Sequence, residues 1–270
     1  MSPIDHFSFG ALTPALAYIM SSAGSMLGLL LTSRARLLSP KEARWWLVGA
    51  AVSIGGTGIW VMHFIAMMGF SVEGTTIRYD VLRTVVSALL AVIVVGAGLF
   101  LVNRGGSRPA YLLGGGTLAG IGVAGMHYLG MAAMNMAGHV NYDIKIVALS
   151  VLIAVVAATV ALWFTLRVRG AVAIGAAALI MGVAVTGMHY TGMFSMSVQV
   201  MADHGEIHGA KAIDFLLPLI VGISMITVGL LLTVLLSPSE KELRGDEEFR
   251  ARLNRRDDEP TSSEGNLFKA

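Results

Sequence analysis

Seven long apolar segments take up most of this 270-residue chain, at about residues 9–32, 45–71, 79–102, 110–136, 146–166, 171–200 and 212–236. A helix needs roughly 20 apolar residues to cross a bilayer, and only helices or closed barrels satisfy every backbone polar group there. Charged residues make up 13% of the chain, about half the share usual in a soluble domain. The sequence therefore predicts an all-α integral membrane protein with seven transmembrane helices embedded in the lipid bilayer.

The basic residues predict the orientation of these helices. Of the 19 Lys and Arg residues, fifteen lie in the loops after the first, third and fifth helices or beyond residue 236. Loops rich in Lys and Arg remain in the cytoplasm, so the N-terminus is predicted outside and the C-terminus inside. We expect two domains, a membrane domain at 1–236 and a charged, disordered cytoplasmic tail at 237–270. Such a tail is too short for an enzyme.

A six-residue pattern, M-H-[FY]-x-[AG]-M, occurs three times, at residues 62–67, 126–131 and 188–193. The histidines of the three copies are 64 and then 62 residues apart, and a fixed period marks an internal repeat. Each repeat comprises two helices, namely 2–3, 4–5 and 6–7, and the first helix is additional. Parallel repeats are related by an axis along the membrane normal. A pseudo-threefold arrangement would therefore bring the three histidines together near the outer face.

Each copy combines an imidazole with methionine thioethers inside an apolar run. Residues four and seven positions apart share a helical face, which extends each motif into a stripe. Thioethers bind Cu(I) well and Zn(II) poorly, whereas imidazole accepts both copper oxidation states. A polar residue inside a membrane span is costly and tends to be functional. The predicted ligands of copper, as Cu(I) or Cu(II), are His63, Met67 and Met62, then His127, Met131, Met134 and Met126, and then His189, Met193, Met196 and Met188.

The three stripes are unequal. The first copy has Phe70 at the position where the other two have a second sulfur, Met134 or Met196. If the protein holds fewer metal ions than copies of the motif, the sequence predicts that His127 and His189 anchor them.

Two further features recur with the motif. A glycine stands seven residues before each histidine, and small residues at such positions let membrane helices approach closely. An aspartate preceded by a tyrosine begins the third and fifth helices, where we interpret it as an N-cap. These residues are Gly56, Gly120, Gly182, Asp80 and Asp143.

The repeated residues resemble the MHYT domain, a family of bacterial inner-membrane sensory modules. The third copy reads Met188-His189-Tyr190-Thr191, and the resemblance covers roughly residues 8–236. It implies a multi-pass protein of the bacterial inner (cytoplasmic) membrane whose motif residues bind copper near the outer face. It also implies sensing of a diatomic gas (oxygen, carbon monoxide or nitric oxide) or of redox state. Many relatives carry a cytoplasmic signalling domain, and its absence from this sequence predicts a separate cytoplasmic signalling protein as partner.

Two other functions stay open at this point. Soft ligands stacked along a helix are compatible with copper transport or handling, and two motif histidines are compatible with a b-type haem. We expect no enzyme activity, because the spans contain neither paired carboxylates nor a nucleophile beside a base. Nucleic-acid binding is not expected either, since membrane topology explains the basic residues.

Overall fold

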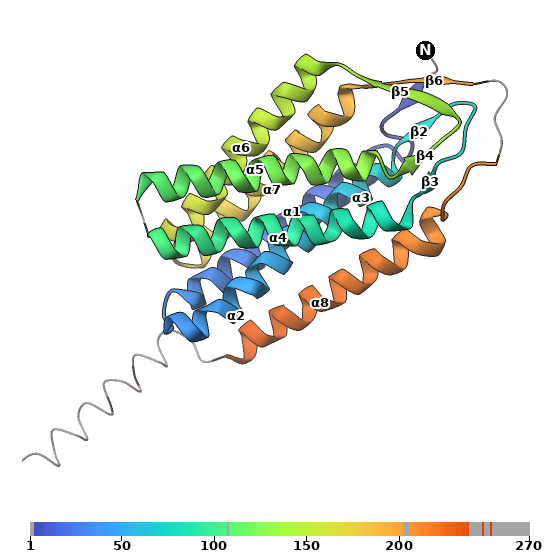
Figure 1. Ribbon diagram of the computed structural model, residues 1–270. Coiled ribbons are helices and arrows are strands. Elements are labelled where there is room, and N and C mark those ends of the chain that lie inside the picture. Colours follow the sequence, from blue (N-terminus) through green and yellow to red (C-terminus); the bar gives the residue numbers. More distant parts are fainter. Residues whose placement is uncertain (1–2, 107, 202–205, 238–244, 246–248, 250–270) are drawn as a thin grey trace, which may run out of the picture. The chain divides into compact units, whose positions relative to one another are not determined.

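The computed structural model has the helical membrane architecture that the sequence predicts (Figure 1). It describes residues 3–106, 108–201 and 206–237, together with residues 245 and 249. The chain divides into two compact units, Met1–Leu231 and Leu232–Ala270, and all three motif histidines belong to the first. Apart from Ser237, Gly245 and Phe249, the predicted tail at 237–270 lies outside the described residues.

Seven helices among the described residues are long and apolar enough to cross a membrane. The second span is continuous but consists of three parts, of which the middle one is π-helical. The elements are α1 (Leu12–Ala35), then α2 (Pro40–Ala51), η1 (Val52–Val61) and α3 (Met62–Met68), followed by α4 (Val81–Gly105), α5 (Pro109–Met131), α6 (Ile144–Arg167), α7 (Ala171–Phe194), η2 (Ala212–Leu216) and α8 (Leu217–Leu236).

Three antiparallel strand pairs connect the ends of these helices. The pairs are β1 (Ile4–Asp5) with β2 (Ser71–Val72), β3 (Arg78–Tyr79) with β4 (Met134–Asn135), and β5 (Gly138–Tyr142) with β6 (Met196–Val200). In each pair, a strand that follows α3, α5 or α7 lies beside a strand that precedes α1, α4 or α6. The three motif helices therefore end in equivalent surroundings, as a repeat requires.

Two helices are shorter than predicted. The helices expected at 110–136 and 171–200 end at Met131 and Phe194, because Met134 and Met196 already lie in β4 and β6. The apolar run continues from helix into strand in both places. Hydrophobic pattern alone does not separate a buried strand from the end of a buried helix, so this boundary could not be predicted from the apolar run.

The spans of the first unit contact one another in a closed series. The second span packs against α1 and α4, and the series continues through α5, α6 and α7 back to α1. This differs in one detail from the predicted arrangement of repeats, in which the first helix is additional. In the part of the chain that the structure describes, α1 rather than α8 packs against α7 and completes the series.

The glycines before the motifs lie at close helix contacts. A Cβ added at Gly120 would overlap the backbone of α6, and one added at Gly182 would overlap side chains of α1. In the second span the equivalent contact belongs to Gly55, whose added Cβ would lie 2.7 Å from a backbone oxygen of α4. A Cβ at Gly56 would meet side chains rather than backbone, one of α8 at 3.3 Å and one of α4 at 4.0 Å. The π-helical turns of η1 explain the difference of one residue, because they place more residues in each turn.

The predicted N-caps are confirmed. The carboxylate of Asp80 accepts a hydrogen bond from the backbone N–H of Arg83 at 2.9 Å, and that of Asp143 accepts one from Lys145 at 2.8 Å. Each bond satisfies one of the free N–H groups at the start of α4 or α6. These two aspartates are therefore structural residues of the helix ends.

Candidate metal centre

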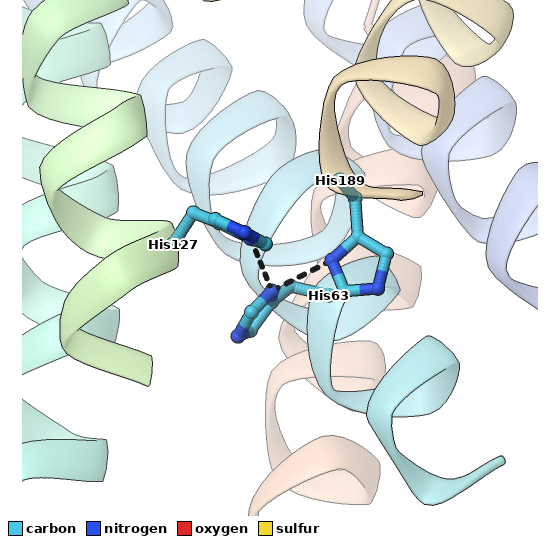
Figure 2. Close-up of side chains that lie close together, drawn as sticks. All are labelled: His63, His127 and His189. Atoms are coloured by element: carbon cyan, nitrogen blue, oxygen red, sulfur yellow. Dashed lines mark hydrogen bonds between the residues drawn. The ribbon is translucent and has the colours of Figure 1, made fainter. Parts of the chain in front are cut away.

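The three motif histidines meet inside the bundle (Figure 2). His63 comes from α3, His127 from α5 and His189 from α7, and each side chain is 1% exposed. Their ring centroids are 4.9, 4.9 and 5.1 Å apart. The shared location that the pseudo-threefold repeat predicts is thus present, and we call these residues the histidine triad.

The Nδ1 atoms of the triad converge. Nδ1 of His63 lies 2.9 Å from Nδ1 of His189 and 3.1 Å from Nδ1 of His127 (Figure 2). Nδ1 of a neutral His63 carries either one hydrogen or one lone pair, so it can form a full hydrogen bond with only one of these two neighbours at a time. Three imidazoles around one ion with bonds of about 2.0–2.1 Å would have their nitrogens roughly 3.3–3.6 Å apart. A small outward movement of the rings would therefore seat a cation that receives all three lone pairs.

The opposite ring nitrogens face glycines of the next motif copy. Nε2 of His63 lies against Gly130 and Nε2 of His127 lies against Gly192, so closely that an added Cβ would overlap either ring. Among the described residues these Nε2 atoms have no hydrogen-bond partner. The glycine three positions after the second and third histidines thus makes room for the imidazole of the preceding copy. The sequence contained this signal in the [AG] position of the motif, but its purpose was not predicted.

The first copy carries Ala66 at this small position. Its side chain is buried in a cluster with Ala17 of α1 and with Met62. A methyl group is therefore accommodated at this position of the first copy.

Sulfur lies one helical turn outward from the triad. Met67, Met131 and Met193 are four residues after the histidines, still within their helices, and are 1–2% exposed. Residues four apart share a helical face, so these three thioethers form the layer next to the imidazoles. The methionines that precede the histidines are buried too, at 1–3% exposure, and are Met62, Met126 and Met188.

The two remaining predicted ligands lie outside the helices. Met134 pairs with Tyr79 across β3 and β4, and Met196 pairs with Tyr142 across β5 and β6. The spacing of seven residues therefore does not continue the helical face of the histidines. The structure brings the three histidines together, keeps the methionines four positions later on the same helices, and gives Met134 and Met196 equivalent places in the strand pairs.

Side-chain hydrogen bonds fix the motif helices against their neighbours. The hydroxyl groups of Tyr128 on α5 and Ser150 on α6 lie 2.6 Å apart. The first copy has Phe64 instead of tyrosine, and there the indole N–H of Trp60 donates to Ser87 on α4 at 2.9 Å. The Trp60 bond is buried and the Tyr128 bond is partly buried, and an unpaired polar group is costly in such surroundings. They hold the backbone from which the histidines project.

The segment before α1 covers the outer ends of two motif helices. The ring of His6 lies 4.9 Å from Phe194 and 5.6 Å from Phe70, and the backbone N–H of Ser8 donates to Gly69. Burial lowers the pKa of His6, although the nearby carboxylate of Asp5 opposes this. The ring is therefore neutral at neutral pH and adds no positive charge above the triad.

The layer below the triad is apolar. Ile59, Val123 and Val185 each stand four residues before a motif histidine, on the inner side of the triad. A metal ion moving inward from the histidines would have to pass this ring of aliphatic side chains, which offers no ligand. The geometry thus supports a closed site near the outer end more than an ion path.

The triad does not have the geometry of a haem site. Two axial histidines place their nitrogens on opposite faces of a flat macrocycle, which fills the space between them. Here the Nδ1 atoms of His63 and His127 are 3.1 Å apart and the third ring closes the remaining side. Nitrogens this close together leave no room for a flat macrocycle between the rings.

Comparisons with known proteins agree with the internal repeat. The family MHYT, described as "Bacterial signalling protein N terminal repeat", matches residues 56–115 and 120–178. The chain is 36% identical over 258 residues to the bifunctional diguanylate cyclase/cyclic di-GMP phosphodiesterase MucR of Pseudomonas aeruginosa, covering 92% of this chain and 37% of MucR. It is 32% identical to the cyclic di-GMP phosphodiesterase NbdA of the same species, covering 74% of this chain and 27% of NbdA.

A third relative comes from a different organism. The signaling protein YkoW of Bacillus subtilis is 28% identical, with 70% of this chain and 24% of YkoW covered. The chain thus spans between about a quarter and two fifths of the length of these three relatives. No solved structure matches it.

Proposed function

Because the membrane part of this chain belongs to the MHYT family, we propose that it is a copper-binding sensory module. It is a multi-pass inner-membrane domain of the kind found in bacterial signalling proteins, with seven spans among its described residues. The observation that carries the proposal is the histidine triad, in which buried imidazoles from three helices converge closely enough to bind one ion after a small outward movement of the rings.

The donor set favours copper over other metals. Three imidazoles alone would also suit zinc. The layer of Met67, Met131 and Met193 immediately outward adds uncharged thioethers, which prefer Cu(I). Hard cations such as Mg²⁺ and Ca²⁺ take oxygen ligands, and the triad and its sulfur layer contain none. His63, His127 and His189 would hold the ion, with the three methionines as the closest soft donors.

The chain's own contribution is to hold the ligands and to exclude water. The triad is fully enclosed, Gly130 and Gly192 admit the rings of His63 and His127, and the segment around His6 covers the outer side. Copper bound there would supply reversible binding of a diatomic gas, or a change of oxidation state with a different preferred geometry.

A signal at the triad has a continuous path to the cytoplasmic side. Each histidine belongs to a different helix, so a change in how the three rings are held shifts α3, α5 and α7 relative to one another. The α3 helix continues without a break through η1 into α2, which begins after the loop at Ser39. A π-helical stretch in a long helix often marks a functional site or hinge, and packed helices switch between discrete arrangements.

The output is proposed to be a cytoplasmic activity on cyclic di-GMP. The names of MucR and NbdA describe enzymes that make or degrade cyclic di-GMP. This chain matches less than half of the length of each. We propose that the membrane domain controls a cytoplasmic signalling partner of this type, as a separate protein, and that the chain itself is no enzyme.

Metal analysis of the protein purified in detergent after growth with copper tests this proposal. We expect about one copper ion per chain in the wild type and none in the triple variant His63→Ala, His127→Ala, His189→Ala. The control is His139→Ala, because His139 is exposed on β5 away from the triad, and it should retain copper. Zinc in place of copper in the wild type, or equal copper in the triple variant, would contradict the proposal.

A further inference from the structure

An apolar cavity lies in the interior of the bundle, below the histidine triad. Its volume is about 60 Å³, and its lining comes from η1, α4, α5, α6 and α7. Thr165 is the one polar residue of the lining, and its hydroxyl already donates to the backbone oxygen of Leu162 at 2.7 Å. Only the lone pairs of the Thr165 hydroxyl oxygen remain for water, which needs two to four polar partners, and apolar cavities of that kind stay dry and bind small apolar molecules.

The cavity reaches the layer directly beneath the triad. Ile59, Val123 and Val185 line it, and each stands four residues before one of the three histidines. Met188, the neighbour of His189 in the chain, lines it as well. Since positions four apart share a helical face, one helical turn of about 5.4 Å separates this end of the cavity from the imidazoles.

A second apolar hollow lies beside the cavity, towards the lipid-facing side of the bundle. It lies between α6 and α7, and its outer walls include Leu152, Val156 and Ile180, which are 59%, 54% and 55% exposed. Ala157 and Met181 line both this hollow and the central cavity. A short alanine side chain and a flexible methionine thus stand between the hydrocarbon of the bilayer and the space below the triad.

We propose that the cavity is a binding pocket for a small apolar molecule of the diatomic-gas class, which enters from the bilayer between α6 and α7. Such molecules dissolve better in hydrocarbon than in water. Their concentration beside the lipid-facing hollow is therefore higher than in the aqueous phase. The neutral lining of the pocket accepts them and rejects ions and water. This inference rests on the proposed function in one respect, which is that the molecule held in the pocket is the one sensed at the triad.

Xenon binding to the metal-free protein tests the pocket without relying on copper. The probe is xenon gas, followed by ¹²⁹Xe NMR of the full chain in detergent. We expect saturable binding by the wild type and a loss of affinity of at least about tenfold in Ala157→Leu, whose larger side chain fills the neck. The matched control is Ala148→Leu on the same helix, since Ala148 is exposed and lines neither space. It should bind xenon like the wild type.

A second variant and a second readout complete the test. Ala158→Leu fills the cavity at a residue that does not line the outer hollow, and it should lose xenon even if Ala157→Leu folds poorly. The absence of saturable xenon binding in the wild type, or equal binding in all four proteins, would overturn the inference. Copper content of the same variants, measured before the metal is removed, reports on the proposed function separately, because these variants leave the triad intact.

Discussion

Replacement of His63 by alanine is expected to abolish copper binding, although the first motif copy has the fewest sulfurs. Nδ1 of His63 lies within 3.1 Å of the same atom in both other histidines, so His63 occupies the centre of the triad. Loss of a residue that only supports a ligand costs about 10- to 100-fold in metal affinity, and loss of a ligand should cost more. A competition titration of purified protein with a Cu(I) chelator measures the effect.

The control for the His63 substitution is a histidine outside the triad. His139→Ala should leave the Cu(I) affinity unchanged, because this histidine is exposed on β5. Helicity measured by circular dichroism should match the wild type in both variants, which separates loss of a ligand from loss of the fold. A His63→Ala protein that binds Cu(I) as tightly as the wild type would instead favour a site anchored by His127 and His189 alone.

Gly192→Ala is expected to disrupt the triad from a position that carries no ligand. The added Cβ would overlap the ring of His127, and that ring is enclosed on all sides. The imidazole must then turn away, which moves its Nδ1 from the common centre. Overpacking in a tight interior costs about 1–3 kcal/mol, and we expect a lower melting temperature together with a large loss of Cu(I) affinity. Gly130→Ala should have the same two effects, because its added Cβ would overlap the ring of His63.

Two glycines on the same helices provide matched controls. No atom lies within 4 Å of a Cβ added at Gly187 on α7, and at Gly125 on α5 the nearest atom is 3.9 Å away. Gly187→Ala and Gly125→Ala should therefore retain copper, and by helix propensity they should be neutral or more stable by about 0.5–1 kcal/mol. Equal behaviour of all four variants would show that the small position of the motif has no connection with the histidines.

Much of this architecture could be predicted from the sequence. Long apolar segments define the spans, since hydrocarbon forces the backbone into helices. The fixed period of the motif, together with its place on helices of one direction, led to the expectation that His63, His127 and His189 meet. They do meet, because the repeat places equivalent residues at equal depth around one axis.

Other features depended on contacts that spacing does not reveal. The place of α1 beside α7 follows from packing, because both α1 and α8 are apolar enough to occupy it. The strands at Met134 and Met196 continue an apolar run, which conceals the ends of α5 and α7. The π-helical turns of η1 moved the close glycine contact from Gly56 to Gly55, and no local pattern indicated them.

The central claim is that the histidine triad holds one copper ion. X-ray absorption at the copper edge, on protein loaded with one equivalent of Cu(I), tests it most directly. We predict scattering from three imidazoles with nitrogen at about 2.0 Å, which disappears in the triple variant His63→Ala, His127→Ala, His189→Ala. A wild-type spectrum without imidazole scattering, or one that the triple variant reproduces, would contradict the account.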